Sequence, residues 1–488
     1  MTRADGAGTG DGNDEGRPTG ALRRTRAARP GALRIPTRRE LRDVAQLAGP
    51  IVLVQVGIQL MGVVDAAMVG RVSPAAMAAT ALGNFYWMLV TIVGQGTIMA
   101  LDPLVSQAVG ARDWLGVRLG LQRGLVLGVV LAVPAMLLLV PAGAALVALG
   151  QPADVAHLAG GYALACIPGA LAYFWFVALR QTLQAFASVR PILVTIVLAN
   201  LCNVVLDWAL IFGRLGAPEL GVAGAAWATT ASRWIMCVSL YVAGWSTFRP
   251  HMRGSWRRAL QWVPIGRMLR LGLPIGFHQW LEIAAFGGAL LLMGLFGTVA
   301  LAAHQIAITL ASLTYMVPLG TSAAAAVLVG HAIGRGDEEA ARREGSAALV
   351  CGVGFMACTA IVLFAFPHAL VRIFTDERQV VVLAVALVPV AAVFQVFDGV
   401  QGVSSGVLRG AGDTTVPMLI NMLGFVGVGI PAAAWLAFGL GLGPTGVWWG
   451  LVAALVVVSA ALGWRVHTHL GGDLRRIAVD HGVGESPT

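Results

Sequence analysis

Two acidic residues, Asp65 and Asp207, interrupt long apolar stretches at matched distances from an arginine. Asp65 lies six residues before Arg71, and Asp207 lies seven residues before Arg214. Because a helix rises about 1.5 Å per residue, both carboxyl groups would lie at one depth if these stretches cross a membrane. A charged side chain in hydrocarbon costs at least about 2.5–3.5 kcal/mol, so we expect such acids to have a function.

Asparagines accompany Asp207 at helical spacing. Asn200, Asn203 and Asp207 stand at positions i, i+3 and i+7, which places them on one helix face. Carboxylate and amide oxygens are hard ligands that suit a proton or a small cation. The residues Asp65, Asn203 and Asp207 therefore predict a site for Na⁺ or H⁺, and the alternative for each acid is a buried carboxyl that a neighbour neutralises for structural reasons alone.

The other half of the chain contains a second pair of acids in apolar stretches. Glu282 lies twelve residues after Arg270, and Asp398 lies eleven residues before Arg409, so this pair is also matched in depth, nearer the middle or the inner side. Polar residues accompany the two acids on their helices, namely His278, Gln279, Gln395 and Gln401. We expect Glu282 and Asp398, with Gln279 and Gln395, to form a substrate site or a second cation site.

Other polar or aromatic residues in apolar stretches have simpler interpretations. Arg233 lies in the middle of its stretch and needs a partner, for which Asp207 is a candidate, and a structural ion pair and a role in transport are both open. Asp102 and His304 lie near predicted helix ends, where solvation would suffice. The aromatic run 85–87 is typical of the belt at a membrane surface, and the alternative is that some of these aromatics line the substrate cavity.

The composition of the chain is that of a membrane protein. Hydrophobic residues make up 57% of the 488 positions and charged residues only 12%, far from the usual composition of a soluble domain. All 33 basic residues are arginines, so the chain lacks the lysine of a P-loop or a Schiff base. No HExxH motif, cysteine cluster or credible serine nucleophile is present, and we expect neither an enzyme nor a resident cofactor.

Twelve apolar stretches are long enough to cross a bilayer as helices. They cover about 46–70, 78–104, 116–141, 157–179, 190–213, 221–246, 269–296, 301–330, 346–370, 379–404, 414–438 and 444–466. The sequence thus predicts an all-α polytopic membrane protein. A net charge of +9 does not indicate nucleic acid here, because the arginines lie in short segments between the apolar stretches.

The arginines predict the orientation. With both termini on one side, only Arg71, Arg214, Arg372 and Arg378 lie on the opposite side, so both termini are expected in the cytoplasm of a bacterium, with the chain in its inner membrane. The expected organisation is a disordered tail over 1–44, an N-lobe of six helices over 45–246, a cytoplasmic linker over 247–268, a C-lobe of six helices over 269–466 and a cytoplasmic tail over 467–488.

The two halves of the sequence repeat each other. Pro50 aligns with Pro274, and residues 106–113 (SQAVGARD) align with 330–337 (GHAIGRGD), both at a separation of 224 residues. Because each unit has an even number of spans, the lobes are expected to share one orientation about an axis along the membrane normal. Such lobes usually enclose a substrate pathway and rock around it; a rigid fused scaffold is the alternative.

Several segments resemble one family of membrane transporters. They are MGVVDAAMVGRV (61–72), QAVGAR (107–112), NVVLDWALIFG (203–213), LGVAGAAWAT (220–229) and LRGAGDTTVPMLIN (408–421). Together they resemble the multidrug and toxic compound extrusion (MATE) family of cation-coupled antiporters, and the resemblance extends over about 45–466.

The resemblance implies roles for individual residues. It implies an N-lobe cation site formed by Asp65, Asn203, Asp207 and Thr229. Glu282 and Asp398 resemble the C-lobe acids of the NorM-type bacterial subgroup, whereas an aspartate at position 207 resembles the DinF-type branch. This mixed pattern leaves Na⁺ and H⁺ both open as the coupling ion.

The expected function is therefore export of amphipathic, often cationic organic compounds in exchange for inward-moving Na⁺ or H⁺. The expected partners are these small molecules and membrane lipids, with no nucleic acid, and the chain is expected to work as a monomer. The alternative is a flippase for a lipid-linked oligosaccharide, which would need an arginine-rich cavity to hold pyrophosphate. A channel is less favoured because neither half offers a ring of charges or a carbonyl filter.

Overall fold

The computed structural model describes residues 34–254 and 256–477. Positions 1–33 of the predicted N-terminal tail and 478–488 of the predicted C-terminal tail lie outside these residues. The first helix begins at Arg38, inside the stretch expected to be a tail, because Thr37 and Glu40 cap its N-terminus reciprocally.

The described part of the first half of the chain, up to Ala243, forms eight helices. They are α1 Arg38–Val69, α2 Pro74–Ile98, α3 Leu101–Gly110, α4 Trp114–Leu139, α5 Ala142–Ala148, α6 Ala153–Ala185, α7 Arg190–Phe212 and α8 Val222–Ala243. A short helix, α9 Trp245–Met252, then begins the connection to the second half.

The second half repeats this order. Its helices are α10 Trp262–Gly294, α11 Thr298–Gly334, α12 Glu338–Ala365, α13 Pro367–Arg372, α14 Arg378–Gly410, α15 Thr415–Met422, α16 Ile430–Ala434 and α17 Gly443–Gly471. Wide π-helical turns over Leu423–Gly429 and Trp435–Gly439 join α15 and α16 into one continuous span, Thr415–Gly439.

The predicted spans are helices in the structure. Eleven spans, with α2 and α3 counted together, are long and apolar enough to cross a membrane among the described residues. The remaining predicted stretch, 221–246, forms α8, which is less apolar because it carries Thr229, Thr230, Ser232 and Arg233. These four side chains are buried, so α8 presents its polar residues to other helices. The all-α prediction of two six-helix lobes is confirmed.

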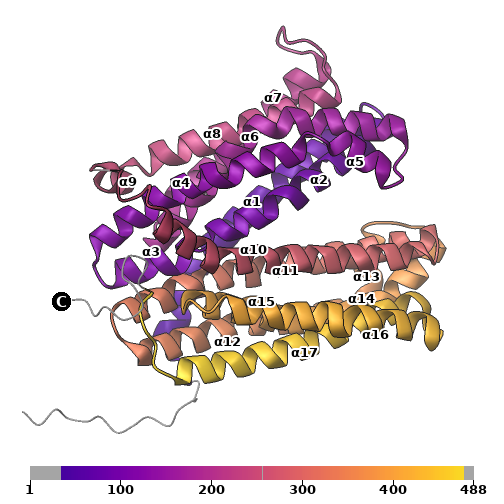
Figure 1. The fold of residues 1–488 in the computed structure, drawn as a ribbon. Helices are drawn as coiled ribbons and strands as arrows, with labels where there is room; N and C mark the ends of the chain where they lie inside the picture. The colour runs from indigo at the N-terminus through magenta and orange to yellow at the C-terminus, as the bar shows by residue number, and fades with distance from the viewer. Residues whose placement is uncertain (1–33, 255, 478–488) are drawn as a thin grey trace, which may run out of the picture.

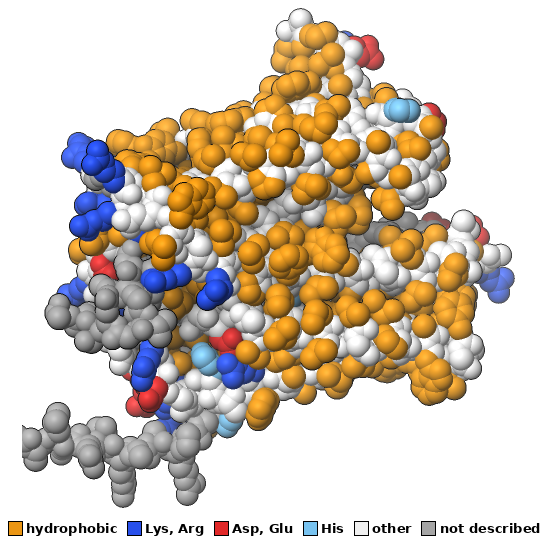
Figure 2. Space-filling model, viewed as in Figure 1, with side chains coloured by type: hydrophobic (Ala, Val, Ile, Leu, Met, Phe, Trp, Pro, Cys, Tyr) orange, Lys and Arg blue, Asp and Glu red, His pale blue; other side chains and the backbone are white. Residues whose placement is uncertain are grey.

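The two lobes lie side by side along their long axes (Figure 1). We call α1–α8 the N-lobe and α10–α17 the C-lobe. Arginine side chains gather around α9 and the visible ends of α3 and α12, and we call this the arginine-rich end (Figure 2). At the opposite, far end, a hollow separates the two lobes in Figure 2.

Among the described residues, the closest contacts between the lobes lie in their halves nearest the arginine-rich end. There α1 and α3 pack against α11, and α2 packs against α10. A Cβ atom on Gly276 would lie 2.3 Å from the carbonyl oxygen of Val93, and one on Gly330 would lie 2.1 Å from Oγ of Ser106. Any larger residue would push the lobes apart, so glycine permits this closed contact.

A buried ion pair joins the lobes at the same level. Nε of Arg409 in α14 lies 3.2 Å from Oδ2 of Asp102 in α3, and Nε2 of Gln181 donates to the other Asp102 oxygen at 2.8 Å. Asp102 is only 2% exposed, so the expectation that solvation suffices for it is wrong. Its position near a helix end brings it to the interface between lobes instead of to water.

The chain segment after α17 adds a second connection. The Ile477 backbone N–H donates to Oε1 of Gln107 at 2.8 Å, and Arg476 pairs with Asp113. Burial raises the pKa of Asp113, but hydrogen bonds from Gly116 and Arg476 outweigh it, and the pKa lies below its usual value. The end of the C-lobe chain is therefore held on the N-lobe.

Cysteines at positions 106 and 330 should form a disulfide under mild oxidation. We expect the double variant Ser106→Cys/Gly330→Cys, with the five native cysteines replaced by alanine, to cross-link, because the two Cβ positions are 2.9 Å apart and a shift of about 1 Å between the lobes brings them to the roughly 3.8 Å of a disulfide. A protease site is inserted within 253–261, so that cleavage there cuts the chain between the lobes. A non-reducing gel then shows whether the disulfide still joins the two fragments.

The matched control is Phe85→Cys/Leu290→Cys, whose positions face the open side from opposite lobes. It should not cross-link under the same conditions. Equal cross-linking of both pairs would mean that the lobes are not closed at the arginine-rich end.

Candidate functional site

Three N-lobe helices bring the predicted cation residues together. Asp65 comes from α1, Asn203 and Asp207 from α7, and Thr229 from α8, and the three helices pack against one another. Oγ1 of Thr229 lies 3.1 Å from Oδ2 of Asp65. The carboxyl groups of Asp65 and Asp207 lie within hydrogen-bonding reach of each other. The depth matching that the sequence suggested is thus a contact in the structure.

The oxygens of this cluster are buried and largely unpartnered. Asn203 and Asp207 are fully buried, and Asp65 is 7% exposed. Among the described residues, Oδ1 of Asp65, both carboxyl oxygens of Asp207 and both polar side-chain atoms of Asn203 have no hydrogen-bond partner. Leaving polar groups buried and unpaired is costly, so this donor set fits a bound cation or a shared proton.

A small cavity leads to Asp65. Its volume is about 90 Å³, enough for a few water molecules. Thr80, Asn84 and Tyr162 line it together with Asp65. These three residues were missed by the sequence analysis, although Asn84, an amide inside an apolar stretch, was a signal that could have found one of them.

Arg233 has an aromatic partner. Its guanidinium carbon lies 3.5 Å from the centre of the Trp87 ring, and both side chains are 6% exposed. Asp207, the candidate partner from the sequence, instead faces Asp65. The assignment of residue 87 to an exposed aromatic belt is wrong for Trp87, because a buried cation needs its ring.

The second pair of acids lines a large cavity between the lobes. Glu282 of α10 and Asp398 of α14 face a cavity of about 590 Å³. Gln59 of α1 and Phe85 and Met88 of α2 close it from the N-lobe. Most other lining residues belong to the C-lobe and are apolar or aromatic, including Ile283, Phe286, Leu290, Ile308, Tyr315 and Phe394. The cavity can therefore accept an apolar body and a positive charge together.

His304 also lines this cavity, which the sequence analysis did not anticipate. It is 3% exposed, and its ring centre lies 5.5 Å from that of Trp448. The expectation that solvation suffices for His304 is therefore wrong. It lies near the start of α11, where packing against α17 covers it.

A polar network lies behind Glu282. Gln401 interacts with the Glu282 carboxyl group, and its Nε2 lies 2.9 Å from Oδ1 of Asn421 and 3.3 Å from Nε2 of His278. Asn421 is fully buried and was not singled out from the sequence. Asn421 lies in the LRGAGDTTVPMLIN segment, but the sequence of that segment did not indicate that Gln401 would be its hydrogen-bond partner.

The two glutamines assigned to this site lie elsewhere. Gln395 is fully buried, receives a hydrogen bond from Thr314 at 2.7 Å and donates to Thr359 at 3.0 Å, which ties α14 to α11 and α12. Gln279 lies at the contact between lobes, with its Nε2 3.4 Å from Sδ of Met99. Neither is among the residues that line the cavity, because Gln395 bonds to Thr314 and Thr359 and Gln279 contacts Met99 across the interface between lobes.

Comparisons with known proteins agree with this architecture. The family model described as MatE matches residues 50–209 and 274–435, and its two matches begin at the prolines that the internal repeat aligns. The chain is 41% identical over 442 residues to "Probable multidrug resistance protein NorM" of Rhodopseudomonas palustris, which covers 88% of this chain and 92% of that protein. It is 38% identical over 461 residues to the protein of the same name in Burkholderia pseudomallei, covering 92% and 96%.

Solved structures give the same result for the fold. The crystal structure of the eukaryotic MATE transporter AtDTX14 superposes with a TM-score of 0.81 at 26% identity, covering 89% of this chain and 97% of that one. An outward-facing multidrug resistance MATE family transporter gives a TM-score of 0.80 at 19% identity, covering 90% and 99%, and this likeness concerns the fold alone.

Replacing Trp87 should destabilise the N-lobe through Arg233. We expect Trp87→Leu to lower the unfolding free energy, measured by denaturant titration in micelles, more than Trp87→Phe does, because only phenylalanine keeps a ring under the guanidinium. A double-mutant cycle with Arg233→Met should give a coupling of about 1–2 kcal/mol.

Trp435→Leu, at a position 62% exposed, is the control and should change little. Strict additivity of the Trp87 and Arg233 substitutions would contradict the proposed pairing.

Proposed function

This chain belongs to the MatE family, and from that premise we propose that it is a secondary transporter that exports amphipathic, often cationic organic compounds in exchange for inward-moving Na⁺ or H⁺. The observation that carries the proposal is a large cavity between the lobes that has apolar walls and two carboxyl groups. Relatives named as multidrug resistance proteins support the substrate class. In this proposal the arginine-rich end lies in the cytoplasm of a bacterial cell, and the cavity opens outward.

The N-lobe cluster supplies the cation site in this proposal. Asp65, Asn203 and Asp207 offer buried oxygens, and Thr229 holds one Asp65 oxygen. Two carboxylates at contact distance repel each other unless a proton or a cation lies between them. An inward gradient of that ion can therefore fill the site from the outside and empty it inside.

Coupling requires that the ion and the substrate favour different arrangements of the lobes. Helix α1 connects the two sites in this proposal, because it carries Asp65 and also Gln59, which lines the large cavity. The same helix packs against α11 of the C-lobe. Ion binding at Asp65 would thus change the wall of the substrate cavity, and rocking of the lobes would expose that cavity alternately to either side.

The flippase alternative is less well supported. A cavity for a pyrophosphate-linked lipid needs cationic side chains to bind it. No arginine lines the large cavity among the described residues, and the two charged residues there are acids. This favours a cationic substrate over an anionic one.

Asp65→Asn should abolish ion-driven export without unfolding the protein. The substitution removes the negative charge of the carboxyl group and keeps the shape of the side chain, so the site can no longer bind and release the coupling ion. The assay is dye transport in reconstituted vesicles under separately imposed Na⁺ and pH gradients, which also identifies the coupling ion.

Asp154→Asn is the matched control, because Asp154 is exposed at the start of α6. It should transport as the wild-type chain does. Wild-type, gradient-dependent transport by Asp65→Asn would rule out the N-lobe cation site.

The double variant Glu282→Gln/Asp398→Asn should weaken export of cationic dyes more than of neutral ones. We expect a difference of about tenfold, the effect of roughly 1.4 kcal/mol, because the two carboxyl groups attract positive charge in the cavity. Initial export rates over a range of dye concentrations measure it.

Asp376→Asn, an exposed acid outside the cavity, should affect neither dye. Equal losses for cationic and neutral dyes in the double variant would indicate that the pair has only a structural role.

A further inference from the structure

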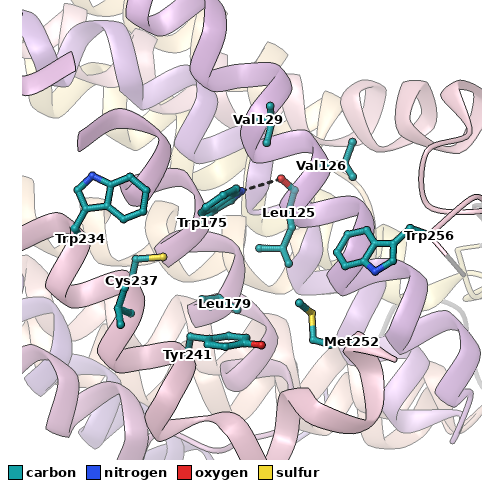
Figure 3. Close-up of a pocket in the computed structure, with 11 residues that line it drawn as sticks. Leu125, Val126, Val129, Trp175, Leu179, Trp234, Cys237, Tyr241, Met252 and Trp256 are labelled. Atoms are coloured by element: carbon teal, nitrogen blue, oxygen red, sulfur yellow. Dashed lines mark hydrogen bonds between the residues drawn. The ribbon is translucent and has the colours of Figure 1, made fainter. Parts of the chain in front are cut away.

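A second large cavity lies on the outer side of the N-lobe, away from the contact between lobes. It is a groove of about 430 Å³ bounded by α4, α6, α8, α9 and the linker residue Trp256. Figure 3 shows Trp175, Trp234, Tyr241 and Trp256 arranged around it, with Met252 at one end. Nothing in the proposed transport cycle uses this groove.

The lining of the groove is apolar. Nε1 of Trp175 donates to the Leu125 carbonyl oxygen at 3.1 Å, the dashed line in Figure 3, and Nε1 of Trp234 donates to the Pro168 carbonyl oxygen at 3.1 Å. Both indole N–H groups are thus already used by the backbone. No carboxylate or arginine lines the groove among the described residues. The groove therefore suits hydrocarbon and lacks the carboxyl groups that attract positive charge in the cavity between the lobes.

The groove opens on the surface that faces lipid. Val129 is 43% exposed and Val238 is 55% exposed at its rim. Along α8 it extends from Trp234 to Tyr241, about 10 Å of helix at 1.5 Å per residue. It runs along the helices, the direction in which an acyl chain lies in a leaflet.

One end of the groove is formed by an arginine-rich stretch of the chain. Met252 and Trp256 line that end, and the exposed arginines Arg249, Arg253 and Arg258 lie within a few residues of them. This is the arginine-rich end, where a basic segment meets lipid headgroups. An apolar slot that ends at exposed cations matches an acyl chain attached to an anionic head.

We propose that this groove binds an acyl chain of an anionic phospholipid, with the headgroup phosphate held by the arginines of α9 and the linker. A phosphate next to guanidinium groups forms strong charge-assisted hydrogen bonds, while the zwitterionic headgroup of phosphatidylcholine offers a weaker net attraction. The lipid would hold the N-lobe at a fixed depth in the leaflet. The proposal is independent of the ion and substrate sites and rests only on the membrane orientation proposed above.

The test is native mass spectrometry of the full chain in detergent, titrated with phosphatidylglycerol or phosphatidylcholine of identical acyl chains. We expect phosphatidylglycerol to bind about tenfold more tightly. Val129→Trp, which fills the groove, should weaken binding of both lipids. Arg249→Gln/Arg253→Gln/Arg258→Gln should lower phosphatidylglycerol binding to the phosphatidylcholine level and leave phosphatidylcholine unchanged.

The C-lobe supplies matched controls. A groove of about 480 Å³ between α12 and α14, lined by Phe364, Val393 and Phe397 among others, is also apolar but lies nearer the far end. Val393→Trp and the pair Arg372→Gln/Arg378→Gln should leave phosphatidylglycerol binding at the wild-type level.

A second measurement covers the case in which Val129→Trp does not fold. Phosphatidylglycerol brominated on its acyl chain should quench the fluorescence of the wild-type chain more than that of Trp256→Phe. The proposal is overturned if both lipids bind equally, if the control variants weaken binding as much as the groove variants, or if quenching does not depend on Trp256.

Discussion

The cost of an unpaired polar group in hydrocarbon organises this molecule. Arg233 is buried and lies on the ring of Trp87, and Asp102 is buried and pairs with Arg409 of the other lobe. Each has a partner that offsets part of the cost of burying its charge. The Asp65–Asp207 cluster differs, because most of its oxygens have no partner among the described residues. A polar cluster that the fold leaves unsatisfied in this way is suited to bind something from outside the chain.

The contact between the lobes is close, but its interactions are weak enough for the lobes to separate. Glycines allow the backbones of α2 and α10, and of α3 and α11, to approach closely near the arginine-rich end. A buried ion pair adds specificity, although desolvation of its charges offsets much of its attraction. Such an interface can hold the lobes in register without fusing them. At the far end the lobes separate, and the cavity with Glu282 and Asp398 lies between them.

The cavity between the lobes and the outer groove of the N-lobe differ in chemistry. The cavity between the lobes combines aromatic walls with carboxyl groups, so it can distinguish molecules by charge. The outer groove has apolar and aromatic walls, two indole N–H groups bonded to backbone carbonyls and no charged lining among the described residues, so it suits a hydrocarbon chain. Any preference for a charged ligand there must come from the arginines beyond its end.

The sequence alone determined the helices, the repeat and the identity of the acids that matter, because apolar length, arginine placement and the rarity of intramembrane carboxylates are local properties. It also paired Asp65 with Asp207 by depth. Only the tertiary structure decided which side chains meet, since contact depends on helix rotation and on packing between segments far apart in the chain. Thus Gln279 and Gln395 have partners outside the cavity of the acid pair. Asn421 bonds to Gln401, and Tyr162 lines the small cavity at Asp65, neither of which the sequence indicated. Arg233 was left open between roles until the fold placed Trp87 beneath it, because an aromatic face is a partner that charge counting cannot detect.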